Sequence, residues 1–384
     1  MINSSCFIEY FTDIPEYREE GKVHHLLTEV LFISVAATIA NATSWGQVET
    51  FAKTREDWLR QFLTLPYGIP SHDTFERVNE AIDPVQFSKC FAAWTQDIAE
   101  RSTGTIIAID GKTSRGSFDR QLQKDPIHIV NAWISSNSLI LGQLKTNVKS
   151  NEITAIPKLL DMLFVKGCII TIDAMGCQKD IAEKIIDSKA DYVLAVKGNQ
   201  PTLMQNIVDW FDFAEQNEYK DFEHDYFRTL DKGHGRIEKR KYYITEDITW
   251  LESKDDWKGL KSIGMAIREN VENGKTTVER RYFISSLKAD AKVFAKAVRS
   301  HWGVESTHWI LDMVFKEDES RERKNSGSEN KSLLNKIVLN LLKQDTQNKK
   351  MSLTTKRYKA SMDLNYLEKI LFNNISKNQF NTAD

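Results

Sequence analysis

The chain has 384 residues, of which 41% are apolar and 10% aromatic, so two or three domains with ordinary hydrophobic cores are expected. Its four cysteines, Cys6, Cys90, Cys168 and Cys177, are widely spaced and form no CxxC pair. This spacing argues against a disulfide framework and a structural zinc site, and it fits a reducing cytosol. The formal net charge of −2 does not exclude a nucleic-acid partner, because 52 basic and 54 acidic residues can be segregated on the surface.

No membrane or secretory segment is expected. The most apolar stretch, residues 30–42, is too short to span a bilayer, and Glu29 precedes it directly, so it predicts a core helix. The first residues lack the basic, apolar and small-residue regions of a secretory signal. We therefore expect a cytoplasmic protein with no membrane partner.

Residues 1–100 are expected to form a small N-terminal helical domain. Apolar residues recur at helical spacing over residues 23–31 and again over residues 51–62. Proline and glycine at residues 66–70 then interrupt the pattern before a further helix begins.

Residues 101–210 change to a mixed α/β pattern. Strand-like runs cover residues 105–110, 127–134 and 139–146, followed by a helix over 151–164, a strand into Asp173, a helix over 178–190, a strand over 192–196 and a helix from Pro201. The order βββαβαβα is typical of the ribonuclease-H-like fold, a mixed sheet with flanking helices. In such a sheet the first strand pairs in parallel with the fourth, because a crossover helix separates them.

The remaining chain completes this organisation. Residues 211–290 alternate polar and apolar side chains and predict a β-rich insertion subdomain. Residues 291–345 return to a helical pattern and form the last part of the core. Residues 346–384 make a basic C-terminal tail, which is expected to be loosely folded.

Three acids occupy positions that suit metal-dependent chemistry on phosphodiesters. Asp110 and Asp173 each end an apolar strand-like run, and Glu305 lies in the helical run His301-Trp302-Gly303-Val304-Glu305. Since chemistry collects at strand ends in α/β sheets, the acids predict a site for two Mg²⁺ (or Mn²⁺) ions roughly 3.5–4 Å apart. Asp110 is the expected bridging ligand, with Asp173 and Glu305 on separate ions. The alternative is that these acids merely cap strands or face solvent.

The Glu305 helix carries a polar stripe. His301, Glu305, His308 and Asp312 recur at helical spacing, so they share one face. A solvated face is the alternative for His308 and Asp312. Glu305-x-x-His308 also matches half of a ferritin-like di-iron site, but that fold needs a second copy, which the sequence lacks.

Basic residues beside these acids are candidates for DNA phosphate contacts. Asp110-Gly111-Lys112-Thr113 is not a phosphate-binding loop, since Ile106 stands where that motif needs glycine. Lys112 and Arg115 are instead expected to contact phosphates next to the metal ions.

Two further segments are candidates for DNA contact. The basic run over residues 232–241, with His234 and Arg236, is expected to grip a DNA backbone, the alternative being a solvated hairpin. Lys197 and Gln200 follow a strand on the Asp173 side, and they either contact DNA ends or form a simple turn.

Several ordered motifs resemble the ISAs-one (H-repeat-associated) family of DDE transposases, within the IS-four-like superfamily. The resemblance covers residues 10–343 and rests on residues 70–75, 109–112, 149–153, 171–178, 197–200, 233–236 and 301–305. In the wider superfamily, Arg precedes the catalytic glutamate by four residues and Lys follows it by seven. Here those positions hold His301 and Asp312, so the roles of these two residues stay open.

The resemblance implies an insertion-sequence transposase that cuts DNA at terminal inverted repeats and joins it to target DNA. Asp110, Asp173 and Glu305 match the catalytic and metal-binding positions of the family, and His301 and His308 are assigned to DNA contact. Residues 1–100 resemble the family's associated domain, a candidate for DNA binding. A protein of this kind is expected to join the nucleoid when bound to DNA and to act there as a dimer or larger assembly. A stand-alone nuclease and a catalytically inactive or domesticated DNA-binding relic are the alternatives.

Overall fold

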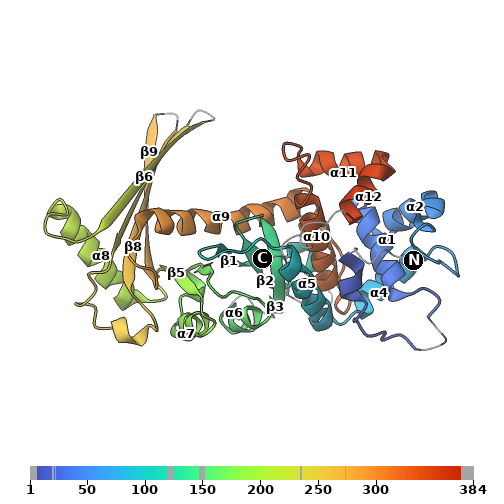
Figure 1. Ribbon diagram of the computed structural model, residues 1–384, viewed down its shortest axis with the longest axis horizontal. Coiled ribbons are helices and arrows are strands. Elements are labelled where there is room, and N and C mark those ends of the chain that lie inside the picture. Colours follow the sequence, from blue (N-terminus) through green and yellow to red (C-terminus); the bar gives the residue numbers. More distant parts are fainter. Residues whose placement is uncertain are drawn as a thin grey trace, which may run out of the picture.

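The computed structural model describes residues 7–19, 21, 23–118, 125–146, 152–233, 236–272 and 274–372. The molecule is elongated, with a helical end, a central mixed sheet and, at the other end, long strands that project beyond the body (Figure 1). A single long helix, α9 (Ala291–Met313), runs from the long strands across the central sheet. Among the described helices, none is both long and apolar enough to cross a membrane.

Within the described residues the strands form one nine-stranded sheet, in the order β3-β2-β1-β4-β5-β9-β8-β7-β6. Its first five members are β1 (Ile106–Thr113), β2 (His128–Ile134), β3 (Leu139–Thr146), β4 (Ile169–Ile172) and β5 (Asp191–Val196). β1, β2 and β3 pair antiparallel, whereas β1 pairs in parallel with β4 and β4 with β5. This pairing confirms the predicted mixed α/β fold with ribonuclease-H-like topology.

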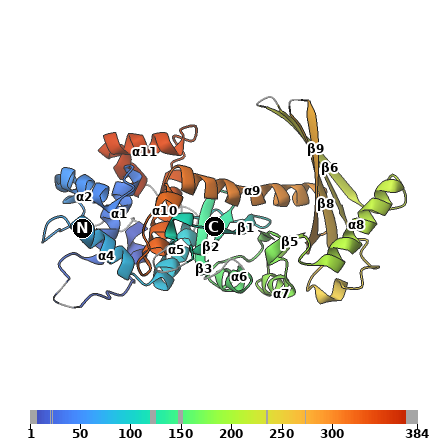
Figure 2. The same ribbon diagram turned by 180° about the vertical axis from the view of Figure 1, so that it is seen from behind.

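Helices cover both faces of the central sheet, as the front and back views show (Figures 1 and 2). One face carries α6 (Glu152–Asp161), α7 (Lys179–Asp187) and α8 (Pro201–Gln216), and α9 crosses the other. Because both faces are covered, β4 and the first half of β1, Ile106–Ile109, are mainly apolar. β1 then continues to Thr113 in antiparallel pairing with β2, so the expectation that this strand ends at Asp110 is wrong. Alternate residues serve the two cores: Ile107 packs with α6 and α7, and Ala108 packs on the α9 side.

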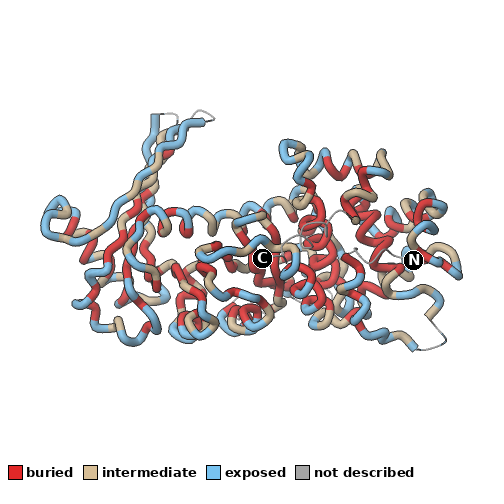
Figure 3. The backbone as a smooth tube through the Cα atoms, viewed as in Figure 1, coloured by how far each residue is buried: buried red, intermediate tan, exposed pale blue. Residues whose placement is uncertain are grey.

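The strands of the predicted β-rich insertion extend the central sheet. Its strands are β6 (Asp225–Gly233), β7 (Arg236–Thr245), β8 (Ser262–Glu272) and β9 (Lys275–Ser285). β9 pairs antiparallel with β5, so the backbone edge that β5 would otherwise expose is hydrogen-bonded. The inner parts of β7 to β9 are buried, whereas their outer parts are exposed where they project from the body (Figure 3).

The helical end combines helices from the N-terminal and C-terminal parts of the described chain. It contains η1 (Phe7–Phe11), α1 (Leu27–Ile39), α2 (Trp45–Thr54), α3 (Glu56–Leu59), α4 (His72–Ala81) and α5 (Pro84–Ile98), together with α10 (Gly327–Lys343), α11 (Leu353–Met362) and α12 (Leu364–Phe372). Their apolar side chains form one core, which continues under α9 at Val304 and Leu311.

The expectation of a loosely folded tail is wrong for residues 353–372. Arg357 in α11 is almost fully buried and donates hydrogen bonds to the carbonyl oxygens of Thr38 and Ala42 near the end of α1. Leu367 and Leu371 of α12 are also buried in the helical core. The basic composition misled the prediction because one of the basic residues serves as a buried anchor; residues 373–384 lie outside the described part.

A glycine sets how closely α9 approaches the sheet. Gly303 faces Trp133 of β2, and a Cβ added at Gly303 would lie 2.2 Å from the Trp133 ring. That separation is far below any van der Waals contact, so a larger side chain would push α9 away from the strands. The crossing point lies two residues before Glu305.

We expect Gly303→Ala to lower the free energy of unfolding by about 1–3 kcal/mol, since overpacking against Trp133 outweighs the higher helix propensity of alanine. Gly46→Ala in α2 is the matched control, because no atom lies within 4 Å of its added Cβ. The control should be neutral or slightly stabilising. Urea unfolding of the two variants measures this difference, and equal stabilities would contradict the proposed close packing.

Candidate active site

Asp110 and Asp173 lie side by side at one edge of the central sheet. The last parallel pair between β1 and β4 joins Ile109 to Ile172, and the next residue of each strand run is one of the two aspartates. The charge of Asp173 acts directly on Asp110. The two acids are therefore neighbours because of the parallel pairing, as the sequence predicted from the crossover between their strands.

Helix α9 places three residues of its polar stripe, His301, His308 and Asp312, against the same face of the sheet, whereas Glu305 is exposed. His301 Nδ1 lies 3.1 Å from the Thr171 hydroxyl of β4, and His308 Nδ1 lies 3.6 Å from the Asp110 carboxylate. One turn further on, Asp312 forms an ion pair of 2.7 Å with Lys112 of β1. The alternative of a solvated face is thereby excluded for His308 and Asp312. The exposed side of the helix instead carries Trp309, which is 62% exposed.

Glu305 lies on this helix close enough to the aspartates for their charges to interact. Burial raises the pKa of Asp110 to about 7, and the negative charges of Asp173, Glu152 and Glu305 add to the effect. The pKa of Glu305 is also raised, by partial burial and by Asp173, while Arg281 and Lys197 oppose the shift. Three residues separated by long stretches of sequence thus share one electrostatic environment.

The donor set suits a hard divalent cation. Carboxylate oxygens are the ligands that Mg²⁺ and Mn²⁺ prefer, and a cation among them would relieve the repulsion that raises the pKa of Asp110. Asn131, which pairs with Asp110 across β1 and β2, adds a buried Oδ1 with no hydrogen-bond partner in the described part of the chain. Within that part, however, no three His, Cys, Asp or Glu side chains stand together as a closed ligand group.

The two histidines of the stripe are neutral near pH 7. Burial lowers the pKa of His301 to about 4 and that of His308 to about 3. His308 Nε2 also lies 3.2 Å from the Asn131 amide nitrogen, so the neutral ring accepts there and can present Nδ1–H towards Asp110. The assignment of both histidines to DNA contact stays a prediction, and a neutral ring would make such a contact by hydrogen bonding and not by charge.

Lys112 does not fit the phosphate contact that was expected for it. Its side chain is buried, and its ammonium group lies 2.7 Å from both Asp312 and Glu317. Burial alone would lower the pKa of Lys112, but these carboxylates hold it above its usual range. The lysine therefore ties β1 to the end of α9 and to the loop beyond it, and its charge is already compensated.

The other candidate DNA contacts have different settings. The Arg115 side chain is 86% exposed beside the end of β1, and Lys197 is exposed on the Glu305 side of β5. Gln200 instead braces the loop behind Asp173, since its amide donates to the Cys177 carbonyl at 3.0 Å. Arg236 begins β7 and lines a pocket of the insertion, and His234 lies outside the described residues.

Two residues near the acids escaped the sequence prediction. Glu152 at the start of α6 is buried, bonds to His128 at 2.5 Å and contributes its charge to Asp110. A Cβ at Gly111 would lie 2.4 Å from the Glu152 carboxylate, which shows how tightly β1 packs there. Arg281 of β9 acts on Glu305, although nothing in its local sequence distinguishes it from the arginine beside it.

The topology and the site together define a class of protein: a ribonuclease-H-like domain with one acid inside a central strand, a second directly after the neighbouring parallel strand, and a third on the helix that crosses them. Family comparison gives the particular family. The model described as Transposase DDE domain matches residues 101–341, and the model described as DDE_Tnp_1-associated matches residues 8–95. The chain belongs to the DDE transposase family.

Full-length relatives agree with this assignment. YncI of Escherichia coli O157:H7 is 44% identical over 95% of this chain and 94% of its own length. The H repeat-associated protein YhhI of Escherichia coli strain K12 is 41% identical over 95% of this chain and 97% of its own. Both carry provisional transposase names. A piggyBac transposase in a synaptic complex with hairpin DNA has a TM-score of 0.44 at 12% identity, covering 95% of this chain and 80% of that one, a likeness too weak to define the fold.

The raised pKa of Asp110 predicts a pH-dependent cost of stability in metal-free protein. The folded state binds a proton that the unfolded state has already released, so stability falls as pH rises through about 7. Relative to Asp110→Asn, the wild type should lose about 1.4 kcal/mol between pH 6 and pH 8. Urea unfolding in EDTA gives the free energy of unfolding of both proteins at each pH. Contributions from other titrating groups cancel in the difference between the two proteins. Parallel pH profiles for the two proteins would contradict the shift.

Proposed function

We propose that this protein cuts DNA at the terminal inverted repeats of an insertion sequence and joins the released ends to target DNA, using divalent cations held by Asp110, Asp173 and Glu305. The observation that carries the proposal is the shared electrostatic environment of these acids. Strand pairing brings the aspartates together, and the crossing of α9 adds the glutamate.

The residues have separate tasks in this chemistry. Bound Mg²⁺ or Mn²⁺ ions activate the attacking oxygen and stabilise the leaving oxygen of a phosphodiester. The charges of both other acids act on Asp110, which suits it to hold both ions when they bind, while Asp173 and Glu305 would each hold one. His308 faces Asp110 and is uncharged. It can therefore orient the carboxylate by a hydrogen bond without competing with a bound cation for that carboxylate.

Basic residues around the acids support DNA as the substrate. Arg115 is exposed just beyond the end of β1, the strand that carries Asp110, and Lys197 is exposed near Glu305, so a backbone phosphate can reach both. The projecting strands of the insertion add a second basic surface beyond the body. Two transposon ends must be brought together for transfer, so we expect the DNA complex to contain two or more copies of the chain.

A stand-alone nuclease on the same fold is the second candidate. The same three acids would serve it, but family membership and full-length similarity to proteins with transposase names favour a transposase. A catalytically inactive relic is disfavoured because all three acids are present and interact. Strand transfer from an end-bearing duplex into a target plasmid separates the transposase from the nuclease.

Replacement of any one acid should abolish metal-dependent cleavage. Asp110→Asn, Asp173→Asn and Glu305→Gln are each expected to lower the cleavage rate by roughly three orders of magnitude, the scale for losing a preorganised electrostatic group. DNA binding should persist, because the acids repel the DNA backbone in the absence of metal. Glu100→Gln is the matched control, since Glu100 is exposed outside the site.

The measurement uses a duplex that carries the inverted repeat found beside the gene, with Mg²⁺ and with EDTA. Binding is followed by gel shift and cleavage by denaturing gel. Substantial Mg²⁺-dependent nicking by the Asp173→Asn protein would refute the assignment. Loss of cleavage in the Glu100→Gln control would show that the assay reports general damage to the protein.

A further inference from the structure

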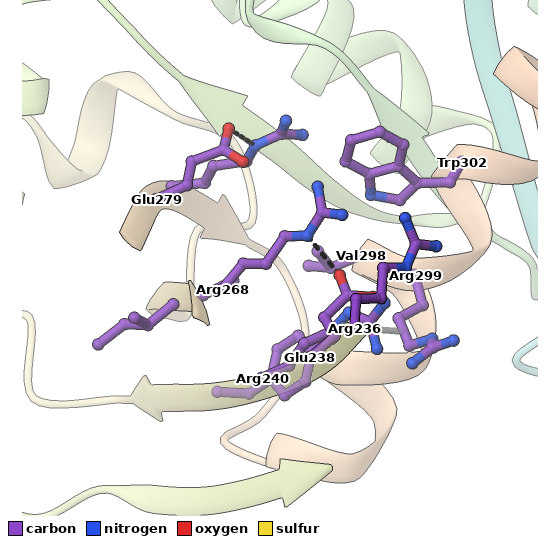
Figure 4. Close-up of a pocket in the computed structure, with 12 residues that line it drawn as sticks. Arg236, Glu238, Arg240, Arg268, Glu279, Val298, Arg299 and Trp302 are labelled. Carbon is purple, nitrogen blue, oxygen red and sulfur yellow. Dashed lines mark hydrogen bonds and ion pairs between the residues drawn. The ribbon is translucent and has the colours of Figure 1, made fainter. Parts of the chain in front are cut away.

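A pocket rich in arginine lies between the insertion and α9, next to the candidate active site. It has a volume of about 230 Å³ and is lined from β7, β8, β9 and α9. Its charged lining consists of five arginines and two glutamates: Arg236, Arg240, Arg268, Arg281, Arg299, Glu238 and Glu279. Figure 4 shows these side chains gathered around the hollow, with Trp302 of α9 at one side.

The two glutamates hold the arginines in place without using all their hydrogen-bond donors. Glu238 is almost fully buried, and its two carboxylate oxygens contact Arg268 and Arg240 separately. Glu279 accepts from Arg281 Nε at 2.7 Å. A guanidinium group has five N–H donors, so each of these arginines retains donors for an added anion. The remaining excess of positive charge favours such an anion.

The Trp302 ring holds two of these arginine side chains in the pocket. The guanidinium of Arg281 lies 4.6 Å from the centre of the Trp302 ring, and that of Arg268 lies 5.9 Å from it. Cation–π contacts of this kind stabilise a guanidinium while leaving its outward N–H groups available. The indole therefore acts as a wall against which the arginines are ordered before any ligand arrives.

The pocket adjoins the part of α9 that carries Glu305. Trp302 precedes Glu305 by three residues on α9, so the two side chains lie on adjoining parts of the helix surface. Arg281 links the pocket to Glu305. It lines the pocket, and its charge opposes the rise that burial causes in the pKa of Glu305. An anion bound by Arg281 and Arg268 would thus lie beside the carboxylate on which cleavage depends.

We propose that this pocket binds backbone phosphates of the DNA strand that passes Glu305, with Arg268, Arg281 and Arg299 as the contacts and Trp302 as the wall. The planar guanidinium fork matches the oxygens of a phosphodiester. The inference rests on DNA being the substrate, as proposed above, and it assigns the insertion a positioning role: it fixes the strand relative to the acids. The neighbouring Arg299 enlarges the contact, since it pairs only at the rim with Asp231.

Adjacent arginines of β9 provide a matched test. Arg281 faces the pocket, whereas Arg280 faces the opposite side of the strand, where it pairs with Asp212 and with Glu215 at 2.8 Å. The probe is a fluorescently labelled DNA duplex of arbitrary sequence in EDTA, because phosphate contacts are independent of base sequence. Fluorescence anisotropy is measured over a series of salt concentrations.

Arg281→Gln and Arg268→Gln should each weaken binding and reduce the slope of log affinity against log salt by about one, the value for one lost phosphate contact. Arg280→Gln should retain the wild-type slope. Arg281→Lys keeps the charge and should restore most of the slope, which separates a lost contact from a misfolded protein. Competition by millimolar inorganic phosphate beyond that of chloride at equal ionic strength would overturn the proposal in favour of a free-phosphate site.

The outcome is separable from the proposed function. Wild-type slopes in Arg281→Gln and Arg268→Gln would overturn the pocket assignment even if Asp110→Asn abolishes cleavage. Conversely, if the wild type shows no metal-dependent cleavage but both variants lower the slope, the pocket remains a DNA phosphate site and the catalytic proposal fails.

Discussion

The packing of α9 across the sheet is the interaction on which the candidate site depends. Strand pairing alone brings Asp110 to Asp173, because the parallel ladder between β1 and β4 places them at the same edge. Glu305 joins them only because α9 packs closely against this face of the sheet. Gly303 permits the close approach, since its missing side chain leaves room for the Trp133 ring of β2. Three polar residues of this helix, His301, His308 and Asp312, face the protein, whereas Glu305 and the aromatic Trp309 are exposed. A helix that buries polar side chains is stable only where each of these groups finds a hydrogen-bond or ion-pair partner.

Buried ion pairs hold the far end of this helix in position. Lys112 of β1 meets Asp312 and the buried Glu317, and the charge of Lys336 from α10 also acts on Glu317. Burial lowers the pKa of Lys336 to about 8, so its charge is sensitive to the loss of any carboxylate in the group. Removing one member would leave an uncompensated buried charge, which costs far more than the pair contributes. The network therefore specifies one orientation of α9 relative to β1 and α10, more than it adds to stability.

The sequence predicted the fold well where local patterns and topology agree. The apolar runs of β1, β4 and β5 and the crossover between them determine the parallel pairing, so the neighbourhood of Asp110 and Asp173 followed from position alone. The prediction from sequence failed where a basic residue is buried inside the protein and does not face a ligand or solvent. Lys112 has the sequence context of a phosphate ligand, but three-dimensional packing surrounds it with acids from a segment some two hundred positions away. Arg357 likewise belongs to a basic segment but is used as an internal anchor. No local pattern can report such partners, because they come from distant parts of the chain.

The insertion shows how a nearly neutral protein can act on a polyanion. The formal net charge of −2 is the sum of charges that are separated in space. The three candidate metal ligands lie together at the central sheet, and the arginines of the pocket lie about one helical turn away along α9. Arg281 and Glu305 lie at the boundary between these regions, and each tempers the field of the other. The positive charge of Arg281 acts on Glu305 from β9, an element distant in sequence from the helix that carries the glutamate. Because β9 is also the strand that joins the insertion to β5, the same pairing that closes the sheet edge brings this arginine to the site.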